Sequence, residues 1–195
     1  MKYNIITISR ELGSGGRYIG EKLAEKLGVD YYDGQIISSV AEKTGFSEEY
    51  IKEAGEYSPY KSFFSYGLVT RSSDGESLSD YIYAVQRKLI IEFAQNGPCV
   101  IVGRCADYIL KDRNDCLNVF VHGDKEDKIK RVMKYRNVSE KEAVKLIKDT
   151  DKRRSVNYNY YTDGQWGNAK NYDICLNSTS LGTDFCVDVL ANMVK

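Results

Sequence analysis

The sequence contains few of the residues that metal centres and disulfide scaffolds require. It has one histidine, His122, and five cysteines, no two of which form a C-x-x-C pair. Protein zinc sites are built mainly from clustered cysteine and histidine. An odd number of cysteines without a secretion signal is typical of free thiols in a reducing compartment. The composition therefore argues against a zinc protein and against a disulfide-stapled secreted domain.

Net charge and long apolar runs are absent as well. The 28 basic residues balance the 28 acidic residues, so no overall field draws the chain to nucleic acid or to an anionic membrane. No apolar stretch approaches the roughly 18 residues of a membrane span, and the first residues lack the apolar core of a signal peptide. We therefore expect a cytoplasmic protein with small-molecule partners, in which any anion site is built locally.

Short β-branched segments alternate with amphipathic segments. The pattern predicts strands at residues 3–8, 29–32, 99–103, 117–121 and 172–177. Helices are predicted between them, capped by Asp33, by Asp124 and by a capping box of Ser139 and Glu142, the last running into a tyrosine-rich loop after residue 154. This alternation favours a three-layer α/β/α domain over residues 1–195 with a five-stranded parallel sheet.

Three polar loops follow strands in this prediction: the glycine loop after the first strand, GRCADYIL at 103–110, and LNSTSLG at 176–182. Ligands of open parallel sheets bind beyond the carboxyl ends of the strands. The polar loops are therefore expected to meet at one rim of the sheet and to form the binding site there.

The glycine loop lies in ISRELGSGGRYIG, residues 8–20, between a predicted strand and a predicted helix. Backbone N–H groups and the positive end of the helix dipole favour a phosphate at such a place. A standard loop reads G-x-x-x-x-G-K-[ST], but no lysine occurs between Lys2 and Lys22. We predict that residues 13–16 wrap a phosphate and that Arg17 replaces the lysine, with Arg10 as the second candidate. A tight turn that binds nothing is the alternative.

Arg104 lies one residue past the end of the most strongly predicted strand, 99–103. At the end of a buried strand its side chain is expected to face the rim, where a guanidinium suits a bidentate phosphate contact. A structural salt bridge is the alternative for this residue.

The helix that ends near residue 154 is predicted to carry a charge in line with its apolar stripe. At about 100° per residue, Asp151 and Arg154 lie on the same side of the helix, and Lys152 and Arg153 point sideways. We expect Arg154 to overhang the rim. A solvated helix end is the alternative interpretation.

Three stretches, taken in order, resemble the cytidylate kinase-like family, a branch of the P-loop nucleoside monophosphate kinases. They are ITISRELGSGGRYIGEKLAEKLGVDYYDGQII, IVGRCADYIL and DTDKRRSVNYNYYTDGQWGNAKNYDICLNSTSLG. The resemblance covers nearly the whole chain outside residues 56–78. It implies an adenylate-kinase-like P-loop fold with a flexible acceptor-binding insert at 56–78 and a lid within 136–170.

The resemblance also implies an activity and a set of contacts. The activity is magnesium-dependent phosphoryl transfer from ATP to a nucleoside monophosphate of the cytidylate type, and no residue is assigned to the metal. The implied donor contacts are Gly13, Ser14, Gly15, Gly16, Arg17, Tyr18, Asn177, Ser178 and Thr179. The implied acceptor contacts are Asp33, Gly34, Arg104 and Asp151, and the catalytic cations are Arg17 together with Lys152, Arg153 and Arg154 of the lid.

The chain departs from the family pattern at the glycine loop and after the third strand. Counted back from LAEKLG, the family's lysine falls on Gly16, the glycine after it on Arg17, and the magnesium-binding Ser/Thr on Tyr18. The base-recognising aspartate falls on Cys105. Two alternatives to a nucleoside monophosphate kinase therefore stay open: a non-catalytic nucleotide sensor, and a kinase of a small non-nucleotide acceptor.

Overall fold

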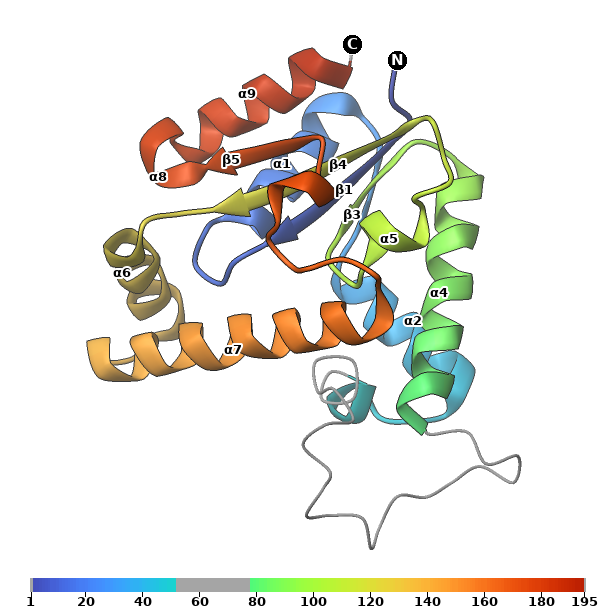
Figure 1. The fold of residues 1–195 in the computed structure, drawn as a ribbon, viewed down its shortest axis with the longest axis horizontal. Coiled ribbons are helices and arrows are strands. Elements are labelled where there is room, and N and C mark those ends of the chain that lie inside the picture. Colours follow the sequence, from blue (N-terminus) through green and yellow to red (C-terminus); the bar gives the residue numbers. More distant parts are fainter. Residues whose placement is uncertain (1, 52–77, 195) are drawn as a thin grey trace, which may run out of the picture.

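The computed structural model describes residues 2–51 and 78–194. Its centre is a five-stranded, fully parallel sheet in the order β2-β3-β1-β4-β5 (Figure 1). The strands are β1 Ile5–Arg10, β2 Asp30–Tyr32, β3 Cys99–Val102, β4 Cys116–His122 and β5 Ile174–Asn177. The predicted acceptor insert at 56–78 lies outside the described residues, apart from Leu78, which begins a helix.

Helices connect these strands and cover both faces of the sheet. They are α1 Gly16–Leu27, α2 Gly34–Thr44, α4 Leu78–Asn96, α5 Ala106–Ile109, α6 Lys125–Arg136, α7 Glu140–Tyr161, α8 Ser178–Leu181 and α9 Thr183–Val194. No helix within the described ranges is long and apolar enough to cross a membrane.

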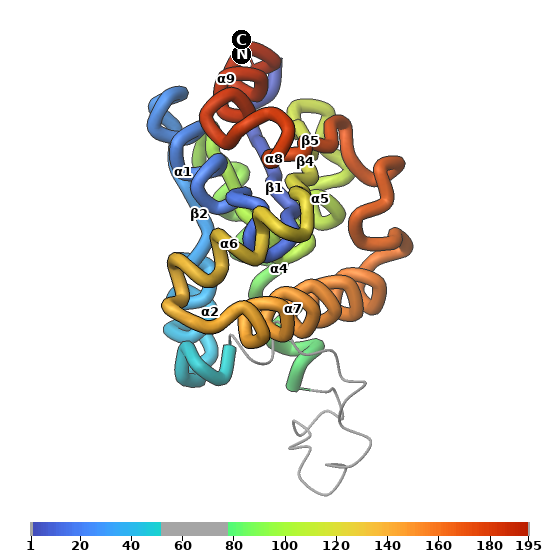
Figure 2. Tube along the Cα trace, turned by 90° about the vertical axis from the view of Figure 1, so that its left-hand side faces the viewer, coloured from blue at the N-terminus to red at the C-terminus, as the bar shows by residue number. Residues whose placement is uncertain are grey.

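The hydrophobic core consists of two layers, one on each side of the sheet. Ile8 and Val119 of the sheet pack with α1 and α9 in one layer, and Ile101 packs with α2, α4 and α5 in the other. The predicted three-layer α/β/α architecture is therefore confirmed. Because all strands are parallel, their carboxyl ends share one rim, and both termini lie at the opposite end of the molecule, near α9 (Figure 2).

The α6–α7 pair forms a separate projection at the rim. A third, smaller core joins Val132 of α6 and Ala143 of α7, and Leu12 of the β1–α1 loop packs against it. Leu12 therefore gives the helix pair an apolar contact with the loop after β1, in addition to polar contacts with that loop. Figure 2 shows the two helices side by side at the rim.

The prediction that Asp33 and Asp124 cap helices with their side chains is wrong. Asp33 and Asp124 do occupy the N-cap positions of α2 and α6, but neither carboxylate accepts a cap hydrogen bond. Asp33 forms ion pairs with Arg10 and Arg17 instead, and Asp124 accepts a hydrogen bond of 3.0 Å from Asn177 Nδ2. Tertiary partners outcompete the local backbone N–H groups in both cases.

The end of α7 also differs from the prediction, because the helix continues to Tyr161 through the expected tyrosine-rich loop. The side chains of this last part find partners in the body of the protein. Tyr161 stacks on Tyr83 of α4 with ring centroids 3.9 Å apart, and the Tyr158 hydroxyl donates to Asp107. These tertiary contacts offset the weak intrinsic helix preference of tyrosine and asparagine.

Replacing Ser139 by alanine should lower the free energy of unfolding by about 1 kcal/mol. Ser139 and Glu142 form the predicted capping box at the start of α7, and the substitution removes the hydroxyl that accepts from the Glu142 amide and donates to the Glu142 carboxylate. Urea denaturation measures the change. The exposed Lys145 in the same helix provides the control, since Lys145→Ala should leave stability nearly unchanged. Equal effects of the two substitutions would contradict the prediction.

Candidate active site

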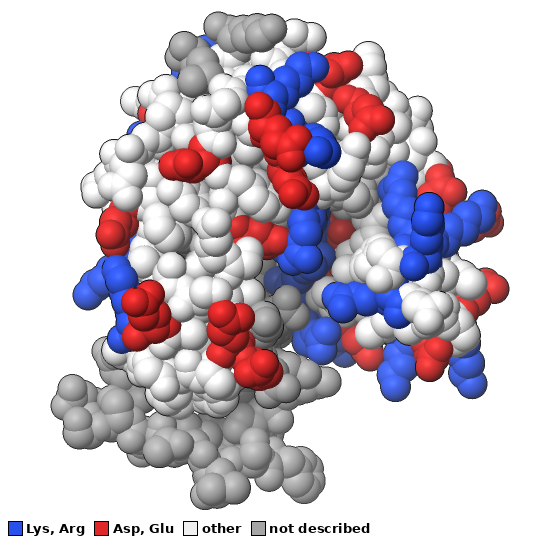
Figure 3. Space-filling view, turned by 180° about the vertical axis from the view of Figure 1, so that it is seen from behind, with Lys and Arg blue, Asp and Glu red and all other residues white. Residues whose placement is uncertain are grey.

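A cavity of about 1270 Å³ opens at the carboxyl ends of β1 and β3, between the glycine loop and α7. Figure 3 shows it as a hollow with basic side chains gathered inside it. The cations among its lining residues are Arg10, Arg17, Arg104, Arg131, Lys134, Arg136, Arg153 and Arg154. The cavity is therefore suited to a ligand with several negative charges.

The glycine loop approaches its neighbours too closely for side chains. Gly13 and Gly15 have φ angles of 82° and 80°, and a Cβ atom on Gly13 would lie 2.7 Å from the Lys128 carbonyl oxygen. No side chain caps α1, which begins at Gly16, so its first N–H groups have no intrahelical acceptor. This geometry leaves backbone donors and the helix dipole for an anion.

Arg131 and Ser178 support the glycine loop from behind. The Arg131 guanidinium donates to the Gly13 carbonyl at 3.2 Å and to Ser178 Oγ at 3.1 Å. Ser178 Oγ in turn donates to the Ser14 carbonyl at 2.6 Å. Ser178 is fully buried, so its hydroxyl stabilises the conformation of the glycine loop.

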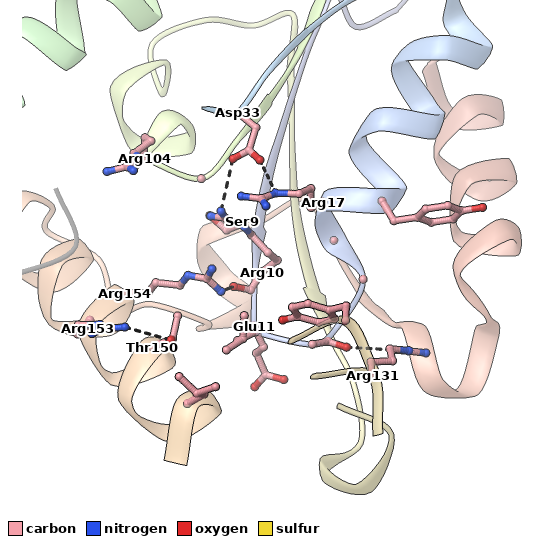
Figure 4. Close-up of a pocket in the computed structure, with 18 of the residues that line it drawn as sticks. Ser9, Arg10, Glu11, Arg17, Asp33, Arg104, Arg131, Thr150, Arg153 and Arg154 are labelled. Carbon is pink, nitrogen blue, oxygen red and sulfur yellow. Dashed lines mark hydrogen bonds and ion pairs between the residues drawn. The ribbon is translucent and has the colours of Figure 1, made fainter. Parts of the chain in front are cut away.

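Arg10 and Arg17 converge on the carboxylate of Asp33 (Figure 4). The Arg10 side chain runs between two glycines: a Cβ on Gly16 would meet its stem, and a Cβ on Gly103 would meet its guanidinium. The Arg10 side chain is 16% exposed, whereas that of Arg17 is 69% exposed. Arg10 is therefore enclosed within the site, and Arg17 lies at its edge.

The turn after β3 is held in an uncommon conformation. Gly103, Arg104 and Cys105 all have left-handed backbones, with φ angles of 76°, 59° and 54°. Such a conformation costs a non-glycine residue on the order of 1 kcal/mol or more. Gln86 Nε2 supports the turn by donating to the Arg104 carbonyl at 3.3 Å. The strained turn brings Arg104 to the cavity, as the strand-end position predicts.

The α7 helix is joined to the loop after β1 by two hydrogen bonds. Asp151 Oδ1 accepts from the Leu12 amide at 2.7 Å, and Arg154 Nη1 donates to the Arg10 carbonyl at 3.0 Å. Arg154 thus faces the rim, as its helix position predicts (Figure 4). Arg153, expected to point sideways, also lines the cavity and donates to Thr150 Oγ1 at 3.2 Å.

A buried ion cluster lies under this junction. Lys128 Nζ is 2.7 Å from Glu11 Oε2 and 3.9 Å from Asp151 Oδ2. Burial raises the pKa of Asp151 to about 6, although the Leu12 amide and the cations of Arg154 and Lys128 favour the ionised carboxylate. The contact between α7 and the loop is therefore sensitive to pH.

Sequence reasoning missed a polar cluster next to the turn after β3. Asp107 is buried, and its carboxylate accepts from the Tyr158 hydroxyl at 2.7 Å and from Ser9 Oγ at 3.5 Å. Burial raises the pKa of Asp107. Asn157 lines the cavity beside Cys105, with Nδ2 at 3.9 Å from the thiol and a buried Oδ1 that has no hydrogen-bond partner. The GRCAD segment signals Asp107, but only the fold brings α7 against it.

The structure brings most of the expected site residues together, but not all. Of those residues, Gly13, Gly15, Gly16, Arg17, Tyr18, Asp33, Arg104, Arg153 and Arg154 line the cavity, and Ser14, Gly34, Asp151, Lys152, Asn177, Ser178 and Thr179 do not. Tyr18 turns its hydroxyl to Asp184 at 3.0 Å. Asn177 caps α8, and Thr179 Oγ1 accepts from the Asp124 amide. Lys152 is exposed to solvent.

The described part of the chain contains no group of three or more His, Cys, Asp or Glu side chains placed to hold a metal ion. Three carboxylates line the cavity: Glu11 and Asp33 are each paired with a cation, and Glu21 is an exposed residue of α1. This donor set does not form a resident metal site.

Comparisons with known proteins agree with this architecture. A model of the cytidylate kinase-like family matches residues 5–180. A solved structure of an uncharacterized protein from Eubacterium ventriosum is 30% identical, with 97% of each chain covered and a TM-score of 0.75. No curated protein matches the chain significantly.

Two shikimate kinases share the fold at lower identity. The one from Bacteroides thetaiotaomicron is 15% identical over 97% of both chains, with a TM-score of 0.55. The one from Acinetobacter baumannii, solved with shikimate, is 16% identical over 98% of this chain and 93% of its own, with a TM-score of 0.55. These similarities identify a P-loop kinase fold.

Replacing Asp151 by asparagine should flatten part of the pH dependence of stability. The folded state raises the pKa of this carboxyl from 3.8 to about 6, so the protein holds the proton more tightly than the unfolded chain does. The resulting stabilisation is complete below about pH 4 and is lost as the pH rises through 6. Asparagine keeps an oxygen that can accept from the Leu12 amide.

Urea denaturation of both proteins between pH 4 and pH 7 tests this prediction. The unfolding free energy of the wild type, relative to Asp151→Asn, should fall by up to about 3 kcal/mol across that range. Parallel pH profiles for the two proteins would show that Asp151 has an ordinary pKa in the folded state.

Proposed function

The chain belongs to the cytidylate kinase-like family, and from this we propose that it transfers a phosphoryl group from ATP to a small acceptor, with a nucleoside monophosphate as the leading candidate. The observation that carries the proposal is the gathering of arginines around one cavity, five of which the proposal uses. These five come from the glycine loop, from the turn after β3 and from α7, and are Arg10, Arg17, Arg104, Arg153 and Arg154.

The arrangement matches what phosphoryl transfer requires. The reaction depends on positioning and on neutralising charge around the transferred group rather than on covalent chemistry by the protein. In this proposal the N–H groups of the glycine loop hold the donor phosphates, and Arg104 holds the acceptor's anionic group. Arg153 and Arg154 supply positive charge from α7 to the group in transit.

Magnesium enters this proposal as part of the substrate, the magnesium–ATP complex. Mg²⁺ in kinase sites keeps several waters and is held largely by phosphate oxygens, with one or two carboxylates at most. Since Glu11 and Asp33 are paired with cations and Glu21 is exposed on α1, we assign no residue of this chain as its ligand.

The acceptor side favours a second candidate, a small non-nucleotide acceptor. Burial raises the pKa of the Cys105 thiol to about 12, so a neutral group stands where the family places its base-recognising aspartate. The nearby Asp107 carboxylate is occupied by Tyr158 and Ser9. The free Oδ1 of Asn157 instead offers an acceptor for a hydroxyl or amino group.

One assay separates the possible functions. The protein is incubated with ATP, magnesium and a panel of nucleoside monophosphates and hydroxylated metabolites, and ADP release is measured. Release that depends on a monophosphate supports the leading proposal, and release that depends on a hydroxylated metabolite supports the second. ATP binding without release under every condition would indicate a nucleotide sensor and would refute phosphoryl transfer to the panel's acceptors.

Replacing Arg154 by alanine should lower turnover by on the order of 10³-fold and change ATP affinity little. A cation that stabilises charge developing in the transition state contributes to the rate more than to ground-state binding. Turnover is measured with the acceptor found above, and ATP affinity by calorimetry. Lys148→Ala is the matched control, because Lys148 is an exposed residue of the same helix. If the Arg154 variant keeps its turnover and loses only thermal stability, the residue is structural.

A further inference from the structure

We propose that Arg10 is the cation of the glycine loop and that arginine and glycine have exchanged places relative to the standard phosphate-binding motif. The inference rests on the proposed function, since it names the residue that contacts the transferred phosphate. It assigns to Arg10 the role that a lysine has in other loops of this kind.

The spacing of the motif defines the exchange. In G-x-x-x-x-G-K-[ST] the first glycine precedes the lysine by six positions. The family's lysine falls on Gly16 in this chain, which places Arg10 at the position of the first glycine. Gly15 keeps its place as the second glycine. The three motif positions therefore hold one cation and two glycines in a permuted order, Arg10, Gly15 and Gly16.

The structure explains why the two substitutions occur together. A Cβ atom on Gly16 would lie 2.6 Å from Arg10 Cβ and 3.0 Å from Arg10 Cγ. Non-bonded carbon atoms do not approach so closely unless one of the two residues shifts. A side chain at residue 16 would therefore collide with the Arg10 side chain in its present conformation. The loop has room for only one of the two.

The conformation of the Arg10 side chain places its positive charge at the centre of the site. The guanidinium lies against Gly103, at the start of the strained turn that carries Arg104. Its stem lies against Gly16 at the start of α1. The charge is thus placed between the donor side and the acceptor side, where the transferred phosphate has to pass.

Arg17 is a weaker candidate for the same role. Its guanidinium pairs with Asp33, and the side chain is 69% exposed, so water screens its charge. Arg10 lies 3.8 Å from the same carboxylate and is 16% exposed. Arg17 therefore neutralises Asp33 from the outside, which leaves Arg10 the more effective cation for a bound phosphate.

Binding of magnesium–ATP to matched variants tests the exchange. Arg10→Met keeps an unbranched apolar stem and removes the charge, and should raise the calorimetric Kd about 10- to 150-fold, as loss of a charge-assisted hydrogen bond does. Arg17→Met should raise it less. Gly16→Lys should also impair binding, because the new side chain meets Arg10.

The double variant Arg10→Gly/Gly16→Lys restores the standard order of glycine and lysine. It should bind ATP more tightly than either Arg10→Gly or Gly16→Lys alone, and thermal unfolding confirms that each variant is folded. The inference is overturned if Arg10→Met binds ATP as the wild type does, or if Arg17→Met loses more affinity. It is also overturned if the folded double variant binds no better than the single variants. Failure of the wild type to bind any nucleoside triphosphate would instead refute the proposed function.

Discussion

Mutual repulsion of cations is the constraint on which the site depends. Seven arginines line one cavity, and like charges gathered in one site destabilise a fold unless they are balanced. The protein balances them with a small number of acceptors placed on different elements. Asp33 forms ion pairs with Arg10 and Arg17. Arg154 pairs with Asp151 and donates a hydrogen bond to the Arg10 carbonyl. The positions of the α2 start and of α7 are thereby tied to the loop after β1.

The strands and most helix starts could be predicted from the sequence because they depend on local periodicity and on glycine stops. The capping box of α7 is such a local signal, and the structure contains it. The side-chain roles of Asp33 and Asp124 could not be predicted in this way, since arginines and an asparagine distant in sequence decide them. The extension of α7 to Tyr161 likewise depends on the stack with Tyr83.

The candidate site shows the same division between local and tertiary signals. Arg104 and Arg154 reach the cavity because a strand end and a helix face determine their directions. Ser178 was expected to contact the donor, but the fold buries it behind the glycine loop, where it bonds the Ser14 carbonyl. Asn157 has no motif of its own, and its proximity to Cys105 follows only from the packing of α7 on the turn after β3.

The shared carboxylate also links the two halves of the proposed reaction. In the proposed reaction Asp33, which precedes α2, belongs to the acceptor side, and Arg10 and Arg17, which pair with it, belong to the donor side. A phosphate that binds at the glycine loop competes with Asp33 for the Arg10 guanidinium, because both are anions. The Arg10 side chain has little freedom to move away, since it is packed between Gly16 and Gly103. Arg17 remains to neutralise Asp33 when that competition succeeds. Arg17 has no counterpart in the standard motif. In the proposed reaction it allows the Arg10 guanidinium to leave Asp33 for the phosphate without leaving the Asp33 carboxylate unpaired next to the incoming acceptor.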